Sequence, residues 1–273
     1  MPILRRLFEF YLDASIHVAF AILAMVHVTS ITLNISVDTH LSWFLFFGSI
    51  VCYNFVKYGV EAEKYILVTD LHQRHIQWVS FVAFVFALYH GYFLSLPVYI
   101  TIAGLVALTG LYAIPVLPNA RSLRSLGGLK IFVVAVVWAG SSVILPVIAA
   151  GESISWDVRV ETIQRFLLVL ILLVPFEIRD LAYDSPELRT LPQRFGIFRT
   201  KIMGASAIVP FFLMNLVKDS IGRTELIANA IICLVLGVLI WSTKRKQPRF
   251  FASFSVESVP ILWWMLLLLS KGI

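Results

Sequence analysis

Charged residues are scarce in this sequence, because Asp, Glu, Lys and Arg make up only 14% of its 273 residues. In a soluble domain roughly a quarter of the residues are charged, so this scarcity excludes an ordinary soluble protein. Cysteine is scarcer still: Cys52 and Cys233 lie in apolar runs without CxxC or Cys/His spacing, which indicates neither a zinc site nor a disulfide framework. The net charge of +6 comes from basic residues scattered through short loops, a pattern that does not favour nucleic-acid binding.

Hydrophobic sequence is abundant instead, at 59% of the residues with a mean hydropathy of +0.88. A membrane-spanning helix needs about 20 predominantly apolar residues, and we expect about nine such spans in one transmembrane helical domain over residues 1–273. This predicts an all-α, polytopic, integral membrane protein. Residues 1–14 form an amphipathic stretch, typical of a helix in the membrane interface. The expected spans are 16–36, 41–60, 76–95, 97–117, 130–150, 162–180, 202–217, 225–242 and 254–270.

The basic residues predict the orientation. Of the 22 Lys and Arg, 17 lie at the amino-terminal segment and around the loops that follow the even-numbered spans. Cytoplasmic loops carry an excess of Lys and Arg, so we expect the amino terminus and these loops in the cytoplasm, in the bacterial inner membrane or an equivalent one. The run beginning near Ile16 is long enough to span and ends without a clear small-x-small cleavage site, so we expect the first span to be retained.

The stretch from Pro175 to Lys201 interrupts the hydrophobic pattern with many charges. If a helix continues past Pro175, then Glu177, Asp180 and Asp184 stand at i, i+3 and i+7 and stack on one face. Three carboxylates on one face repel each other unless a cation lies against them. Charges near a membrane helix end are also expected to point into the bundle or to water, which makes this stretch the first candidate site.

A second polar stretch follows the expected second span. On a helix, Asn54, Lys57, Tyr58 and Glu61 share one face. They form either a binding site or a structural set, in which Lys57 pairs with Glu61 and Asn54 bonds a neighbouring helix. The nearby histidines lack a metal-binding spacing. Lys130, with the basic residues just before it, suits either a phosphate or the topology bias.

The residues IRDLAYDSPELRTLPQRFG, 178–196, resemble the second aspartate-rich motif of the UbiA-type intramembrane prenyltransferases. The predicted spans, with both polar stretches on one side, also look like that family. The resemblance implies a bundle in which aspartate-rich helices hold Mg²⁺ against a prenyl diphosphate, while a lipophilic acceptor attacks the prenyl carbon. It implies Asp180 and Asp184, with Glu61, as metal ligands, and Mg²⁺ at the second motif.

Further roles follow from the resemblance and the charges. Arg179, Arg189 and Arg194 would clamp phosphate oxygens, and Lys130, Asn54 and Tyr58 would bind substrate. The family's first motif, N-D-x-x-D-x-x-x-D, keeps only its Asn here, and Lys57 stands among the positions of the lost aspartates. Lys57 would then act with Asp180 and Asp184 in catalysis, in place of a second metal's charge.

Three functions are compatible with this pattern. The first is a Mg²⁺-dependent prenyltransferase that acts at a cytosolic face on a prenyl diphosphate and a lipophilic acceptor. The second is a catalytically silent relative, which binds an isoprenoid lipid or joins another protein in the membrane, with its carboxylates salt-bridged to arginines. The third is a transporter, for which Gly- or Pro-broken spans in two matching halves are expected but no convincing repeat is found.

Overall fold

The protein is described by a computed structural model that covers residues 2–59, 71–113, 128–184 and 186–271. Within these ranges all regular structure is helical. In chain order the elements are α1 (Pro2–Asp13), α2 (Ile16–Thr32), α3 (Thr39–Asn54), η1 (Phe55–Gly59), α5 (Leu71–Gly91), α6 (Leu96–Ala113), α7 (Leu129–Ala139), η3 (Gly140–Ile144), α8 (Leu145–Ala149), α9 (Trp156–Asp180), η4 (Pro186–Leu188), α10 (Leu191–Leu213), η5 (Met214–Val217), α11 (Arg223–Ser242), η6 (Phe251–Val256) and α12 (Val259–Lys271).

The expected all-α membrane class is confirmed. A helix lies in each of the nine expected ranges, and α1 covers the segment expected to lie in the interface. In the described part of the chain, five helices are long and apolar enough to cross a membrane, or six if α1 and α2, bent by 58°, form one span. The long helix α9 does not qualify, because it carries charges at both of its ends as well as Arg165 in between. Most of these charges belong to the two polar clusters of the bundle that are described below.

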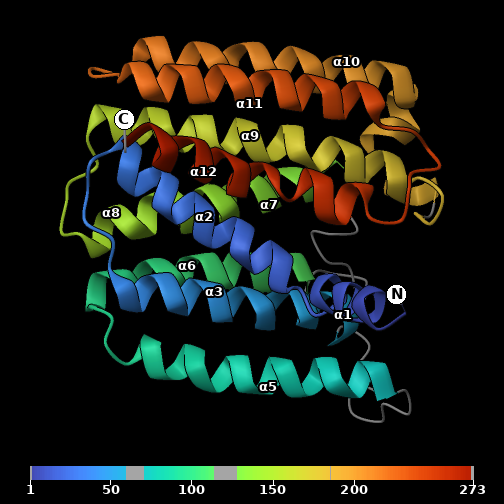
Figure 1. The fold of residues 1–273 in the computed structure, drawn as a ribbon, viewed down its shortest axis with the longest axis horizontal. Coiled ribbons are helices and arrows are strands. Elements are labelled where there is room, and N and C mark those ends of the chain that lie inside the picture. The colour runs from blue at the N-terminus through green and yellow to red at the C-terminus, as the bar shows by residue number, and fades with distance from the viewer. Residues whose placement is uncertain (1, 60–70, 114–127, 185, 272–273) are drawn as a thin grey trace.

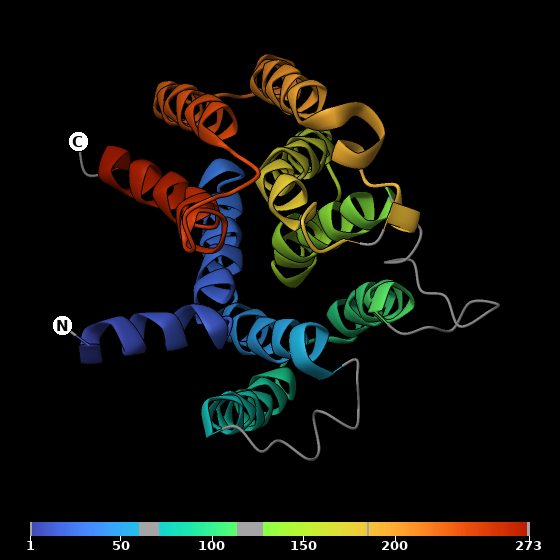
Figure 2. The ribbon, with the colours of Figure 1, turned by 90° about the vertical axis from the view of Figure 1, so that its right-hand side faces the viewer.

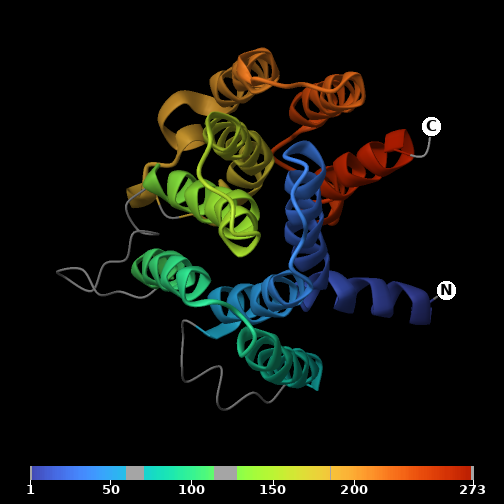
Figure 3. The same ribbon diagram turned by 90° about the vertical axis from the view of Figure 1, so that its left-hand side faces the viewer.

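The helices run roughly side by side along one direction, so their links collect at two ends (Figure 1). One end holds α1, the α9–α10 connection and the α11–η6 connection, and the other holds the links α2–α3, α5–α6, α8–α9 and α10–α11. Seen end-on, α2 lies between α12 and α3, and α10 and α11 lie on the opposite side of the bundle from α5 (Figures 2 and 3). The end that carries α1 also carries the acidic stretch, and we call it the motif end.

The core joins α2, α9, α11 and α12. Its fully buried side chains include Met25, Leu168, Ile232 and Trp263. Small residues let the helices approach closely: a Cβ added to Gly204 of α10 would lie 2.9 Å from a methyl group of Val174 on α9 and would force one of them to move.

Four charged side chains are buried towards the end opposite the motif end. Lys218, just after η5, places its Nζ 2.5 Å from Glu161 of α9 and 2.5 Å from Glu225 of α11. Glu161 also accepts a hydrogen bond of 2.8 Å from Arg165, whose guanidinium stacks over the Trp263 ring. Two positive and two negative charges balance here, and we call these four residues the buried quartet. The sequence patterns did not identify the quartet. The spacing of Glu161 and Arg165 at i, i+4 beside an apolar run does indicate an ion pair inside the bundle.

Candidate active site at the motif end

The acidic stretch folds as expected up to the end of α9. The helix continues through Pro175 to Asp180, which places Glu177 and Asp180 in its last turns. Beyond it, the backbone N–H of Asp184 donates to the carbonyl oxygen of Asp180 at 2.8 Å, so the chain makes one more turn. The three carboxylates are therefore on neighbouring turns, as their spacing predicts.

A cation does lie against this acidic face, and it is the side chain of Lys130. Lys130 comes from the first turn of α7, and its Nζ is 2.8 Å from Glu177 and 3.8 Å from Asp184. Glu177 is only 3% exposed, so the carboxylate of this ion pair is shielded from water. Asp180 has a different partner, since the Nε of Arg179 donates to it at 2.7 Å. Each of the three carboxylates thus lies next to a positive charge of the protein.

This arrangement bears on the expected Mg²⁺ site. Across the described residues, no group of three or more His, Cys, Asp and Glu side chains converges as a metal-binding set. Mg²⁺ binds through one or two carboxylates that are free to face it. Glu177 and Asp180 are paired with Lys130 and Arg179 at 2.8 Å and 2.7 Å, whereas Asp184 has Lys130 only at 3.8 Å, and its Oδ2 is buried without a hydrogen bond among the described residues. Two of the three carboxylates are therefore occupied by cations of the protein, and Asp184 alone keeps an oxygen for a metal. Glu61, the third expected ligand, lies outside the described residues.

A cavity of about 440 Å³ adjoins the acidic face, a usual size for a ligand pocket. Most of its lining is aliphatic and aromatic, from α2, α3, α6, α7, α9 and α12. It extends from Lys130 to Leu145, which are separated by about 22 Å along the continuous helical segment that contains them. The charged residues of its lining are Lys57, Lys130, Arg179, Asp180 and Glu257. All come from the motif end, so the cavity is an apolar tunnel with a charged mouth.

Lys57 is the member of the second polar stretch that reaches this mouth. It lies on η1, a π-helical turn that follows α3 directly, and its Nζ is 3.5 Å from the carbonyl oxygen of Leu12. Its charge interacts with those of Glu257 and Arg179, which line the same cavity. The structure therefore brings together Lys57, which the sequence singled out, and Glu257, which it did not.

Asn54 and Tyr58 face elsewhere. Asn54 is fully buried, and its amide group donates to the carbonyl oxygen of Ala14 at 3.1 Å and to Ser80 at 2.9 Å. This bears out the structural interpretation, in which Asn54 bonds a neighbouring helix. The hydroxyl of Tyr58 donates to the carbonyl oxygen of Asp13 at 3.3 Å. Neither residue lines the cavity, so neither is in position to bind a ligand there.

Arg189 and Arg194 also lie outside the cavity lining. Both are exposed, and Arg189 follows η4 with a left-handed backbone, at a φ of 47°. Of the residues that the sequence proposed for the site, Lys57, Lys130, Arg179 and Asp180 therefore gather at the mouth, with Asp184 beside them through Lys130.

Several solved structures of UbiA homologues have a similar fold. One from Aeropyrum pernix K1, in the apo state, aligns with 93% of this chain and 98% of its own at 11% identity, with a TM-score of 0.67. One from Archaeoglobus fulgidus, bound to GPP and Mg²⁺, aligns with 97% of this chain and 100% of its own at 11% identity, with a TM-score of 0.57. A structure of digeranylgeranylglyceryl phosphate synthase covers 97% of this chain and 96% of its own at 13% identity, with a TM-score of 0.57.

No protein-family model matches the sequence, and no curated protein does. At identities of 11% to 13% the structural likeness concerns the fold and not the chemistry. The likeness extends over nearly the whole length of the chain, and it agrees with the motif at 178–196. This multi-pass integral membrane protein therefore has the UbiA fold.

Proposed function

We propose that this protein binds an isoprenoid diphosphate in the cavity and transfers its prenyl group to a lipophilic acceptor. The observation that carries the proposal is the tunnel itself: an apolar interior of about 440 Å³ ends in a mouth with three cationic side chains, Lys57, Lys130 and Arg179. A prenyl diphosphate has the matching shape, a hydrocarbon tail with an anionic head. A homologue with this fold was solved bound to such a compound, GPP.

In the proposed reaction, the bond between C1 of the prenyl group and the diphosphate oxygen breaks, and the electron pair leaves with the diphosphate. A lone pair of the acceptor forms the new bond to C1, and the acceptor loses a proton. Negative charge develops on the leaving oxygen, where Lys57 and Arg179 would stabilise it.

Mg²⁺ at Asp180 and Asp184 stays a prediction from the motif. Because Arg179 and Lys130 already pair with these carboxylates, the proposed chemistry derives no step from a metal. The role of the ion can be decided by measuring activity with and without Mg²⁺. We also propose that the motif end faces the cytoplasm, where a water-soluble diphosphate product can leave.

The same salt bridges favour a second candidate, a protein that binds an isoprenoid lipid without turning it over. In that case the pairs Lys130–Glu177 and Arg179–Asp180 would serve to fix the end of α9 within the bundle rather than to bind a diphosphate. The cavity would then hold a lipid as a ligand, alone or as part of a membrane complex.

Purified protein should be incubated with radiolabelled prenyl diphosphates of several chain lengths and a cell lipid extract, with and without Mg²⁺. We expect binding of the diphosphate and formation of a labelled, lipid-soluble product. Binding without any product would support the silent lipid-binding protein. Absence of both, with every chain length and in both buffers, would refute the proposal.

A further inference from the structure

Glu257 is the acidic residue of the cavity that the proposed function leaves without a role. It follows η6 directly and comes just before α12, and it lines the charged mouth together with Lys57 and Arg179. Sequence patterns gave no reason to select it, because it stands alone between the basic loop and an apolar helix. Only the fold brings it to the site, since it is 200 residues from Lys57 along the chain.

Its carboxylate differs from the others at the mouth in having no close partner. Glu177 is paired with Lys130 at 2.8 Å, and Asp180 with Arg179 at 2.7 Å. Among the described residues, by contrast, the side chain of Glu257 has neither a hydrogen bond nor an ion pair within 4 Å. Its electrostatic interactions with Lys57 and Arg179 act over longer distances. Glu257 is half-buried and lines the cavity, so its carboxylate can accept a hydrogen bond from a ligand held there.

The backbone just before Glu257 has an unusual conformation. The turn η6 is π-helical, and the N–H of Glu257 reaches back five residues to the carbonyl oxygen of Ala252 at 3.4 Å. Such turns are rare and are frequently found at functional sites. The carbonyl oxygen of Phe254 within the turn accepts from the backbone N–H of Ser258 at 2.8 Å and also lies 3.2 Å from Nε2 of His17 on α2.

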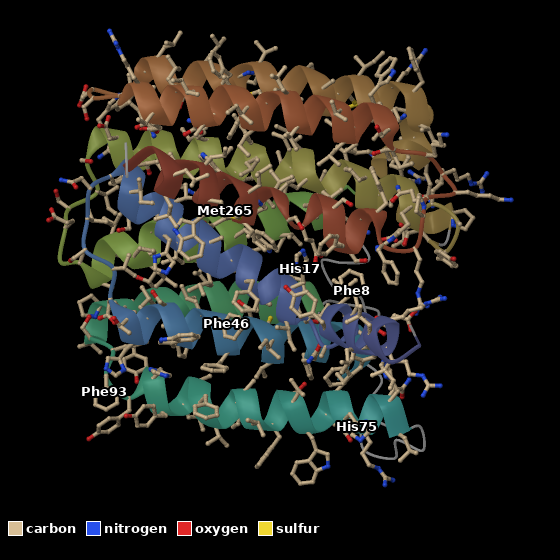
Figure 4. The ribbon with its side chains drawn as sticks, viewed as in Figure 1. Phe8, His17, Phe46, His75, Phe93 and Met265 are labelled. Carbon is tan, nitrogen blue, oxygen red and sulfur yellow. The ribbon has the colours of Figure 1, made fainter. Side chains whose placement is uncertain are left out.

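Further contacts fix this turn against the neighbouring helices. The ring of His17 stacks on Phe254 at 4.9 Å, and the ring of Phe8 on α1 meets Phe254 edge-on at 5.1 Å. His17 and Phe8 lie near each other towards the motif end (Figure 4). Ala252 and Val256, within the turn, are 1% exposed. A packed turn of this kind holds the next residue, Glu257, in a fixed position at the cavity.

The charge of Glu257 indicates which substrate it serves. A carboxylate repels a diphosphate, so it is unsuited to the anionic donor that Lys57 and Arg179 attract. It suits a neutral group with a polarised hydrogen, because hydrogen bonds to a charged acceptor are roughly twice as strong as neutral ones. The lipophilic acceptor of the proposed reaction must lose a proton at the moment when it attacks C1.

From this geometry we infer that Glu257 binds the hydroxyl group of a lipophilic alcohol or phenol, which is the acceptor, and receives its proton. The inference rests on the proposed function for the transfer step. In that step the acceptor oxygen forms its bond to C1, the diphosphate departs with the electron pair of the broken C1–O bond, and the proton passes to the carboxylate of Glu257. Lys57 and Arg179, which line the same mouth, hold the leaving group.

The recognition can be tested without any turnover. A C15 isoprenoid alcohol and its methyl ether have nearly the same shape, but only the alcohol can donate a hydrogen bond. We expect purified wild-type protein in nanodiscs to bind the alcohol about tenfold or more tightly than the ether, the fold-change that corresponds to a hydrogen bond with a charged group. In Glu257→Leu the two probes should bind within about twofold of each other, with Glu257→Gln between the two cases. The exposed carboxylate of Glu152 provides the control, and Glu152→Leu should keep the wild-type ratio.

The outcomes separate the two proposals. Equal affinity of alcohol and ether in the wild-type protein overturns the role of Glu257, even if no variant folds. A wild-type preference that survives in Glu257→Leu does the same. The proposed function is tested separately, by prenyl diphosphate binding, which Glu257→Gln should leave intact or tighten because it removes a negative charge from the mouth. If the alcohol preference depends on Glu257 while no prenyl diphosphate binds, the recognition of the hydroxyl stands and the transferase function falls.

Discussion

Removal of Lys218 tests the buried quartet by changing its charge balance. The side chain of Lys218 is 1% exposed and contacts Glu161 and Glu225 at 2.5 Å each. Burial lowers the pKa of Lys218, but the carboxylates of Glu161 and Glu225 outweigh this and raise the pKa above its ordinary value, so the side chain stays charged. In Lys218→Met, Glu161 keeps Arg165 at 2.8 Å, whereas Glu225 loses the cation that it contacts.

Breaking a buried pair by removing one partner costs about 3–5 kcal/mol, because the remaining charge is buried alone. We therefore expect Lys218→Met to lower the free energy of unfolding by about 3–5 kcal/mol. The double variant Lys218→Met/Glu225→Met restores the balance, and buried pairs are often replaced by apolar residues at little cost, so it should return to within about 1 kcal/mol of wild type. Reversible unfolding in mixed detergent micelles, followed by tryptophan fluorescence, measures both values.

The exposed pair of Arg249 with Glu9 provides a matched control, and Arg249→Met should cost at most about 1 kcal/mol. A single Lys218→Met variant as stable as this control would show that the quartet contributes no electrostatic stabilisation. A double variant no more stable than the single one would show that unbalanced charge is not the cause of the loss.

Three further predictions concern the motif end. Lys57→Ala should weaken prenyl diphosphate binding about tenfold or more, the usual loss for a hydrogen bond to a charged group. Lys201→Ala, at a half-buried lysine outside the cavity lining, should not weaken it, and equal binding in both variants would remove Lys57 from the site. Lys130→Met should leave Glu177 and Asp184 without their cation, so that Mg²⁺ can bind these carboxylates instead. Mg²⁺ should then raise the thermal unfolding midpoint of the variant and not of wild type, and an unchanged midpoint of the variant would contradict the prediction. In a background without the native cysteines, the cysteine of Lys246→Cys should react with an impermeant thiol reagent from the cytoplasmic side, and that of Ser36→Cys from the opposite side. Labelling of both from the same side would refute the proposed orientation.

The sequence predicted the architecture well, because hydrophobic runs long enough to span a membrane are a local signal. Each expected span contains a helix, and the three carboxylates after Pro175 occupy neighbouring turns as their spacing requires. The need for a cation on that face also followed from local charge. Its identity did not, since Lys130 precedes Glu177 by 47 residues and only the packing of α7 against α9 brings them together.

The other features that the sequence did not predict also depend on contacts between residues far apart in the chain. Asn54 was equally compatible with a ligand and with a helix contact, and its two hydrogen bonds to Ala14 and Ser80 are long-range. Glu257 depends on a π-helical turn that no pattern of apolar residues reveals. The buried quartet combines residues from α9, α11 and the segment after η5, so its balance of charges cannot be recognised from any one stretch of sequence.

The positive charge at the acidic face comes from Lys130, which is part of the chain, and not from a bound metal ion. A metal ion at an acidic site exchanges with the surrounding solution, so its occupancy follows the free ion concentration by mass action. An ammonium group attached to the chain cannot be diluted or chelated, and it is present as soon as α7 packs against α9. Two of the three negative charges of the acidic face are therefore balanced by side chains of the protein itself, which are in place from synthesis and independent of the magnesium level of the cell.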